Sequence, residues 1–209
     1  MEAPSQYPPG SSPPNDAQAA ALAYQQLGLT TVPIPRGAKG PRLKEWQRRQ
    51  LGDVNPGDYA PRGNIGIVLG AASGWLVNID LDCREAIALA PSLLPPTEAM
   101  HGRAGAPQSH YSYRVEGDLP KTAHFDDPTV AKTDEQRSRI VDLLSAGTQV
   151  LAPPSCHPSG EVIFWLNGWL SGLPVVTPGV IETAVRELAA ATLLVRHWPA
   201  KGRREDGAL

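Results

Sequence analysis

Two carboxylates, Asp80 and Asp82, end an apolar stretch that begins at Gly74 and is typical of a buried strand. Side chains at i and i+2 on a strand point to the same face, so Asp80 and Asp82 project side by side while Leu81 turns towards the core. Adjacent carboxylates repel each other unless a cation or a proton lies between them, and hard oxygen ligands suit Mg²⁺ or Mn²⁺. The alternative is an Asp-x-Asp that caps a turn and faces water.

A third acid lies in a later apolar stretch. Asp142 is flanked by Ile140, Val141, Leu143 and Leu144, and acids are rarely buried without a partner or a metal. If this strand runs beside the first, three carboxylates converge. Together with substrate phosphates they complete two divalent sites about 3.5–4 Å apart, the geometry of nucleotidyl transfer. The alternative for Asp142 alone is a pair with a lysine.

Between the acids lies an alternating strand on which His110, Ser112 and Arg114 share one face. A Gly-rich segment that contains Arg103 leads into it. Ser109 and His110, with Arg103 upstream, suit the binding of nucleotide phosphates. Taken alone, a histidine such as His110 is more often an ordinary core or surface residue than a ligand.

A basic loop rich in Gly and Pro follows the first predicted strand. Its cations are Arg36, Lys39, Arg42 and Lys44. The net charge of the chain is −2, so any contact with nucleic acid must come from a local basic patch such as this one. The loop is predicted to contact phosphates of a template strand or a nucleotide, and a solvated loop is the alternative.

Composition narrows the class of protein. The chain has 209 residues, of which 41% are apolar, enough for one cored domain with appendages. Aromatic residues are few (6%), whereas 22 Pro and 20 Gly favour turns and short elements over a helical bundle. Cys83 and Cys156 lack CxxC or zinc-finger spacing and are expected to be free in a reducing compartment. Neither a transmembrane run of about 18 apolar residues nor a signal peptide is expected.

The expected fold class is α+β, with a mixed or antiparallel sheet that carries the acids and helices that flank it. The strand over 64–70 and the strand that ends in Asp80 and Asp82 are predicted to form a β-hairpin. The segment over 117–138 is predicted to be a solvent-facing excursion. The other expected elements are helices over 17–27, 84–90 and 178–197, the last with an apolar face from Ile181 to Val195, and strands over 30–34, 109–115, 139–145, 148–152 and 162–166.

In combination the motifs resemble a known family. The resemblance is to the primase-polymerase domain of the archaeo-eukaryotic primase superfamily, and more narrowly to the bifunctional primase/polymerase N-terminal domains of plasmid, phage and integrated-element replication proteins. It covers roughly 17–170 and implies an RRM-like catalytic core. The motifs that carry it are Asn78-Ile79-Asp80-Leu81-Asp82, Gly102-Arg103 with Ser109-His110, Ile140-Val141-Asp142, and Pro153-Pro154-Ser155-Cys156-His157-Pro158-Ser159-Gly160.

The resemblance implies template-directed synthesis of primers, and extension of DNA, from nucleoside triphosphates on a single-stranded DNA template. The implied cofactors are two Mg²⁺ or Mn²⁺ ions. The implied site residues are the metal ligands Asp80, Asp82 and Asp142, the triphosphate ligand His110, and the neighbouring Ser109, Arg103 and His157.

Domain organisation is expected to follow the same family. A disordered leader is expected over 1–15, the catalytic domain over 16–172, and a C-terminal helix packed on it over 173–198. Residues 199–209 are expected to be a tail or the start of a linker to a helicase module, in a cytoplasmic protein encoded by a bacterium, plasmid or phage. Two other classes of function fit the motifs: a two-metal nuclease, and a non-catalytic module that binds single strands through the basic loop.

Overall fold

The computed structural model describes residues 16–131, 138–167, 170 and 172–198. The leader predicted over 1–15 and the tail predicted over 199–209 lie outside these residues. The helices are α1 (Ala17–Gln26), α2 (Arg84–Leu93) and α3 (Pro178–His197), with short 3-10 turns η1 (Trp46–Arg48), η2 (Leu51–Asp53), η3 (Pro56–Asp58) and η4 (Ala71–Ser73). The strands are β1 (Thr31–Ile34), β2 (Asn64–Val68), β3 (Leu76–Leu81), β4 (Met100–Arg103), β5 (Ala106–Val115), β6 (Ala123–Asp126), β7 (Arg139–Leu144), β8 (Gln149–Ala152), β9 (Phe164–Trp165) and β10 (Val175–Val176).

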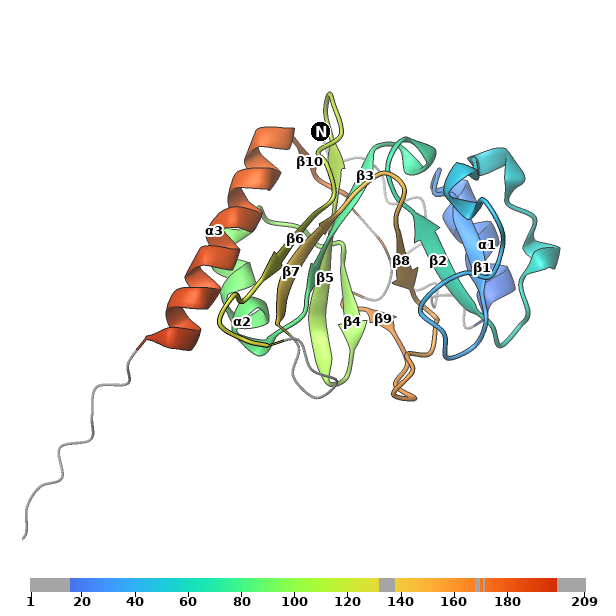
Figure 1. The fold of residues 1–209 in the computed structure, drawn as a ribbon. Helices are drawn as coiled ribbons and strands as arrows, with labels where there is room; N and C mark the ends of the chain where they lie inside the picture. The colour runs from blue at the N-terminus through green and yellow to red at the C-terminus, as the bar shows by residue number, and fades with distance from the viewer. Residues whose placement is uncertain (1–15, 132–137, 168–169, 171, 199–209) are drawn as a thin grey trace, which may run out of the picture.

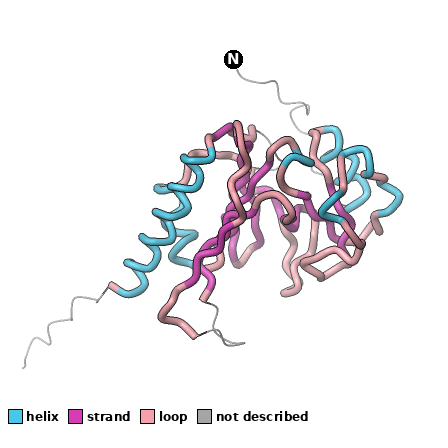
Figure 2. The backbone as a smooth tube through the Cα atoms, turned by 45° about the horizontal axis from the view of Figure 1, so that its top comes forward, coloured by secondary structure: helices cyan, strands magenta, loops and turns pink. Residues whose placement is uncertain are grey.

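Two sheets organise the described residues (Figures 1 and 2). The larger sheet has the strand order β6-β7-β3-β5-β4-β9, and β10 adds a short parallel pairing to β5. The smaller sheet has the order β1-β2-β8. Helices α2 and α3 lie on one side of the larger sheet, and the smaller sheet lies with α1 on its other side (Figure 1). This arrangement confirms the predicted α+β fold class.

Alternation along β3 separates a core face from a polar face. Val77, Ile79 and Leu81 are buried in the core that α2 and α3 complete, which confirms that Leu81 turns inwards. Asn78 and Asp80 therefore point to the opposite face, where the smaller sheet lies. A second core joins that face to the smaller sheet and α1, and its members include Leu76, Trp165, Ile65, Ile67 and Tyr24.

The predicted β-hairpin is wrong. Strand β2 pairs with β1 and β8, whereas β3 pairs with β5 and β7 in the other sheet. Only an isolated bridge between Gly70 and Leu76 links the two strands among the described residues. Gly70 and Gly74 adopt positive φ on either side of η4, and this turn carries the chain from one sheet to the other. Both strands are apolar, so their composition does not indicate which neighbouring strand each one pairs with.

Three other element predictions need correction. The segment over 117–138 contains β6, an edge strand of the larger sheet, which was missed because its alternation spans only four residues. Helix α2 continues through Pro91 to Leu93 instead of ending at Ala90. Val195 is 55% exposed, because the buried stripe of α3 ends at Thr192.

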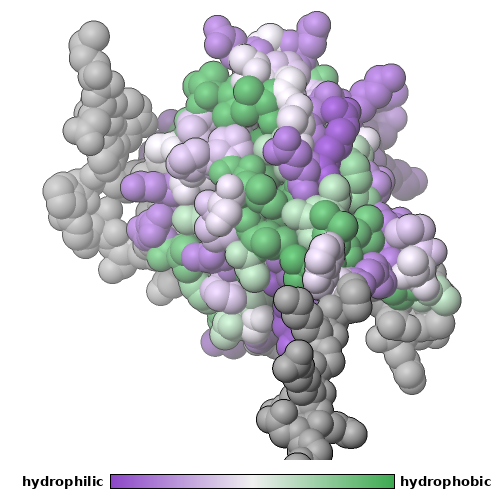
Figure 3. All heavy atoms as spheres, turned by 90° about the vertical axis from the view of Figure 1, so that its left-hand side faces the viewer, coloured by the Kyte–Doolittle hydropathy of each residue, from purple (hydrophilic) through white to green (hydrophobic). Residues whose placement is uncertain are grey.

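Figure 3 shows hydrophobic patches on the side of the molecule where α3 lies.

Asp127, directly after β6, links the C-terminal end of α3 to the larger sheet through hydrogen bonds. Its side chain is buried and accepts hydrogen bonds from Arg196 (3.0 Å) and His197 (2.8 Å) of α3, and from Thr129 (2.7 Å). Although burial acts to raise it, the hydrogen bonds from Thr129, Arg196 and His197 hold the pKa of Asp127 well below its ordinary value.

We expect Asp127→Asn to lower the melting temperature at pH 7 by several degrees, because the anion is lost from this cluster. A carboxylate whose folded-state pKa is depressed stabilises the fold above its ordinary pKa, and the stabilisation is lost as pH falls through the folded-state value. Thermal unfolding of wild type and variant should therefore differ most at neutral pH and converge below pH of about 4. Asp118→Asn, which removes an exposed carboxylate, is the control, and an equal gap at all pH values would contradict the assignment.

Candidate active site

One row of side chains crosses the larger sheet. The register pairs Asp80 of β3 with Asp142 of β7 on one side and with His110 of β5 on the other, and His110 pairs with His101 of β4. Directly paired residues on antiparallel strands place their side chains on the same face. From edge to edge the row is His124, Asp142, Asp80, His110, His101 and Trp165.

A cavity of about 410 Å³ opens beside this row and is lined by residues of both sheets. Asp80, Asp82 and His110 line it from the larger sheet. Lys39 lines it from the basic loop, and His157 lines it from the loop that follows β8. Carboxylates thus share the cavity with cationic and imidazole side chains. The predicted site residues that the cavity brings together are Lys39, Asp80, Asp82, Arg103, Ser109, His110 and His157.

The ring of His110 is held from two directions. Its Nδ1 lies 3.2 Å from Oδ1 of Asn78, whose amide nitrogen donates to Oγ of Ser112 (3.0 Å) and to the carbonyl of Tyr111 (3.2 Å). Because the amide hydrogens are used elsewhere, Oδ1 of Asn78 accepts and Nδ1 of His110 carries the hydrogen. The ring of His101 stacks on that of His110 with a centroid distance of 4.4 Å and an angle of 10° between planes. Both contacts fix the orientation of His110 towards the cavity.

Both stacked rings are neutral near pH 7. Burial lowers the pKa of His110 to about 4, against the opposing charge of Asp82, and the cations Lys39 and Arg103 lower it further. Burial also holds the pKa of His101 well below its ordinary value, and Nε2 of His101 lies 3.2 Å from the carbonyl of Leu151 on β8. A neutral pair can stack without charge repulsion, and the bond to β8 ties the row to the smaller sheet.

Asp142 does not line the cavity, although its cross-strand partner Asp80 does, and it has two basic partners. Its Oδ1 is 2.7 Å from Nη1 of Arg139 and 2.9 Å from Nδ1 of His124, and Nε of Arg139 is 3.0 Å from Asp126. Partial burial acts to lower the pKa of Arg139, but Asp142, Asp126 and Asp82 raise it above its ordinary value. Asp142 is therefore adjacent to Asp80, as the convergence of the acids requires, and it pairs with an arginine and not with the lysine of the alternative.

The three acids have the chemistry of a divalent-metal site, and their backbones are neighbours in the larger sheet. Asp80 and Asp142 are cross-strand partners, and the backbone N–H of Asp82 donates to the carbonyl of Ile140 (3.0 Å), which continues the pairing past the end of β3. Carboxylate oxygens are the ligands that Mg²⁺ and Mn²⁺ prefer. Within the described ranges, no three His, Cys, Asp or Glu side chains already converge as a metal site. Arg139 and His124 occupy Oδ1 of Asp142 in this arrangement.

Arg103 reaches the cavity as one half of an ion pair. Its Nη1 lies 2.6 Å from Glu161, which also accepts from the backbone N–H of Gly105 (2.6 Å) and from Oγ of Ser159 (2.7 Å). Glu161 thereby ties the turn between β4 and β5 to the loop after β8. In that loop, Nδ1 of His157 accepts a hydrogen bond from the N–H of Ser159 (3.1 Å). The predicted role of Arg103 in phosphate binding would require it to share its charge with Glu161.

Asn64 of β2 fixes both loops that face the larger sheet. Its amide nitrogen donates to the carbonyls of Cys156 (2.8 Å) and Ala38 (3.0 Å), and its Oδ1 accepts from the N–H of Cys156 (2.8 Å). Gln149 adds a bond to the carbonyl of Lys39 (2.8 Å). The smaller sheet therefore holds the loops of Lys39 and His157 at the cavity through side-chain amide contacts.

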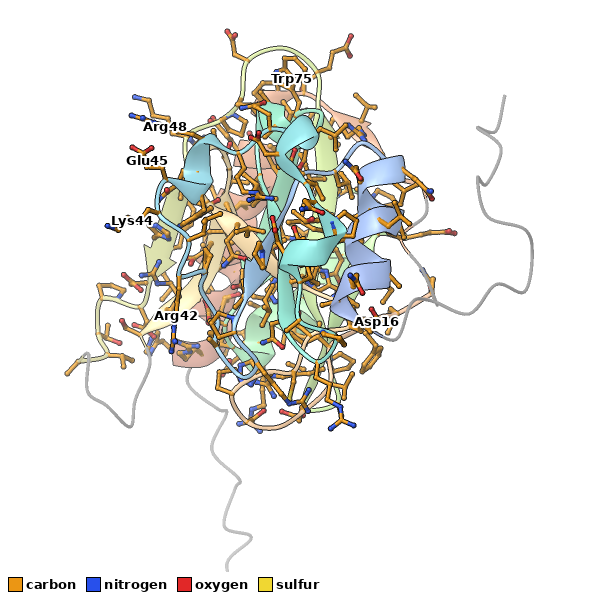
Figure 4. All side chains as sticks on the ribbon, turned by 90° about the vertical axis from the view of Figure 1, so that its right-hand side faces the viewer. Asp16, Arg42, Lys44, Glu45, Arg48 and Trp75 are labelled. Carbon is orange, nitrogen blue, oxygen red and sulfur yellow. The ribbon has the colours of Figure 1, made fainter. Side chains whose placement is uncertain are left out.

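The remaining cations of the basic loop lie outside the cavity. Arg36, Arg42 and Lys44 are exposed, and Arg36 donates to the carbonyl of Arg62 (3.3 Å). Figure 4 shows Arg42, Lys44 and Arg48 projecting outwards along one edge of the molecule. The structure thus divides the loop into one cation at the cavity and a basic outer edge.

Gly102 is required by the close approach of β4 to β5. A Cβ atom there would lie 2.1 Å from the carbonyl oxygen of Ala106 and 2.6 Å from that of Pro107. Because both obstacles are backbone atoms, we expect Gly102→Ala to destabilise the protein by about 2–3 kcal/mol, a fall of about 5–10 °C in melting temperature. Gly40→Ala, which places its Cβ in open space, is the matched control for thermal unfolding. Equal melting temperatures for the two variants would contradict this packing.

The prediction from sequence missed five residues that shape the site. Two of them carried a usable signal, because Asn78 is a polar residue two positions before Asp80, and His101 precedes Gly102 in the predicted motif. The other three contact site residues through pairings that the sequence did not reveal. The five are Asn78, His101, His124, Arg139 and Glu161.

Comparison with known families identifies the class of protein that this fold and site define. Residues 21–177 match the family described as Bifunctional DNA primase/polymerase, N-terminal. The chain belongs to this family, and the resemblance drawn from its motifs is confirmed. A search of curated proteins found no match. No helix within the described residues has the length and apolar character needed to cross a membrane.

Proposed function

We propose that this chain is a primase-polymerase that makes primers and extends DNA from nucleoside triphosphates on a single-stranded DNA template. The observation that carries the proposal is the row in which Asp80 lies between Asp142 and His110, beside a cavity that Asp82 and Lys39 also line. Family membership supports a nucleotidyl-transfer reaction at this site. Replication of a plasmid, phage or mobile element, in partnership with a helicase module, is the proposed context.

The chain's own residues divide into acids at or next to the cavity and basic residues that line it. Asp80, Asp82 and Asp142 would hold two Mg²⁺ or Mn²⁺ ions, which when bound activate the attacking 3′-hydroxyl and neutralise charge on the α-phosphate. His110 and Lys39 line the same cavity, and we expect them to contact the triphosphate. Because stacking and hydrogen bonding fix His110 beforehand, little reorganisation is needed when the substrate binds.

The basic outer edge provides a surface for the template. Arg36, Arg42 and Lys44 are exposed cations outside the cavity, and cations of this kind bind the phosphates of a strand without regard to sequence. Template binding at this edge should weaken steeply as salt is raised. Replacement of Arg42 and Lys44 by Gln together should weaken binding of single strands without changing the affinity for nucleotide alone.

The test is primer synthesis and extension on a single-stranded template with labelled nucleotides and Mn²⁺ or Mg²⁺. We expect products from the wild type and none from Asp142→Asn, with thermal unfolding measured to show that the variant is folded. Loss of template without added nucleotides would favour the two-metal nuclease. Salt-sensitive binding with no product under any condition, and unchanged in Asp142→Asn, would favour the non-catalytic binding module.

A further inference from the structure

We propose that Arg139 is a resident cation that competes with a divalent metal ion for Asp142 and so sets how tightly the carboxylate site binds that ion. The inference rests on the proposed metal site and assigns a role to a residue outside its ligands. Arg139 begins β7 and lies three residues before Asp142, in the strand that pairs with β3.

The contacts of Arg139 place its charge among the acids of the site. Nη1 lies 2.7 Å from Oδ1 of Asp142, and Nε lies 3.0 Å from Oδ1 of Asp126. The charge of Asp82 also acts on the guanidinium. The side chains of Arg139 and Asp142 are only 28% and 15% exposed, so water screens this pair less than a surface ion pair.

A metal ion at the acids meets Arg139 in two ways. It must share Asp142 with the guanidinium or displace it, because Oδ1 of Asp142 already accepts from Arg139 and His124. It also experiences repulsion from the guanidinium, which lies 2.7 Å from Oδ1 of Asp142. Asp126 offers the guanidinium a second carboxylate, so Arg139 can stay in the site when Asp142 turns towards the metal. Each effect weakens metal binding relative to a site without Arg139.

The expected sign of the effect separates this role from a structural one. A variant with a neutral residue at position 139 should bind Mn²⁺ about tenfold more tightly than the wild type, a change in binding free energy of about 1.4 kcal/mol. A merely structural arginine would give the reverse, because loss of its contacts would misplace Asp142 and weaken binding. Arg139→Lys keeps the charge and should stay close to the wild-type affinity.

The experiment measures Mn²⁺ binding directly, with free Mn²⁺ followed by electron paramagnetic resonance at fixed ionic strength and without nucleotide or DNA. Arg139→Gln and Arg139→Met are two neutral variants that differ in hydrogen-bonding ability. Arg186→Gln is the matched control, because it removes the same charge from an exposed ion pair with Glu182 on α3. Circular dichroism and thermal unfolding show which variants are folded.

Tighter Mn²⁺ binding in the neutral variants, with Arg139→Lys and Arg186→Gln unchanged, supports the inference. Wild-type or weaker binding in a folded neutral variant overturns it, as does the absence of saturable binding in every variant. If neither neutral variant folds, Asp126→Asn decides. It should weaken Mn²⁺ binding more than Asp118→Asn does, and equal effects overturn the inference.

Primer extension by the same proteins keeps this inference separate from the proposed function. If the wild type extends primers but the neutral variants do not bind Mn²⁺ more tightly, only the role of Arg139 is contradicted. If the neutral variants bind Mn²⁺ more tightly but the wild type makes no product, the proposed reaction is contradicted and the competition at Asp142 still stands.

Discussion

Asp80→Asn is expected to reduce nucleotide incorporation by about 10³-fold while leaving the fold intact. Asp80 lies at the centre of the row, because it pairs directly with Asp142 on β7 and with His110 on β5. An amide in its place removes a formal charge from the proposed metal site with almost no change in shape. Several kcal/mol of transition-state stabilisation depend on such a ligand, which corresponds to a loss of about this size.

The measurement is the initial rate of primer extension at saturating template and nucleotide. Thermal unfolding of Asp80→Asn should match the wild type within a few degrees, because Asp80 is partly exposed and its backbone stays in the sheet. Asp118→Asn, at an exposed position, should retain full activity. A rate for Asp80→Asn within tenfold of the wild type would remove Asp80 from the metal site.

The strands that carry the motifs could be predicted because their patterns are local. Alternation along β3 placed Asp80 and Leu81 on opposite faces, and the same rule grouped His110 with Ser112 on β5. The helix that begins at Pro178 follows from Thr177, the proline and the apolar period after them. Each of these signals lies within a few residues, where propensity and periodicity act directly.

The pairing of strands could not be predicted in the same way. Strand β2 is buried at every residue, so its sequence fits a partner in either sheet. In strand β6 the apolar Ala123 and Phe125 alternate with His124 and Asp126, but four residues are too few to distinguish the strand from the loop predicted there. Both outcomes depend on contacts between residues far apart in the chain, which a reading of local pattern does not contain.

The same limit explains which site residues were missed. His124, Arg139 and Glu161 are charged or polar residues with no local signal, and each gains its role only from a partner on another element. The smaller sheet was likewise seen as separate strands, although Asn64 and Gln149 position the loops that carry His157 and Lys39. The motifs predicted the acids and His110, whereas the support around them required the structure.

His110→Ala is expected to lower kcat/KM for nucleotide by about 10–100-fold, mainly through a higher KM. The ring is held beside the acids by Asn78 and by stacking on His101, and it lines the cavity in which the proposed reaction takes place. A hydrogen bond to a charged group contributes about 1.5–3 kcal/mol, which corresponds to this range. Steady-state extension at varied nucleotide concentration gives KM and kcat separately.

A double-mutant cycle tests whether Asn78 acts through His110. Asn78→Ala alone should lower kcat/KM, because the ring loses its hydrogen-bond acceptor. In the His110→Ala background the same change should have little further effect, since coupled residues are not additive. Because Asn78 is buried and bonds Ser112 and the backbone of Tyr111, each variant needs an unfolding measurement. Full additivity of the two substitutions, or wild-type kcat/KM in His110→Ala, would contradict the assigned role.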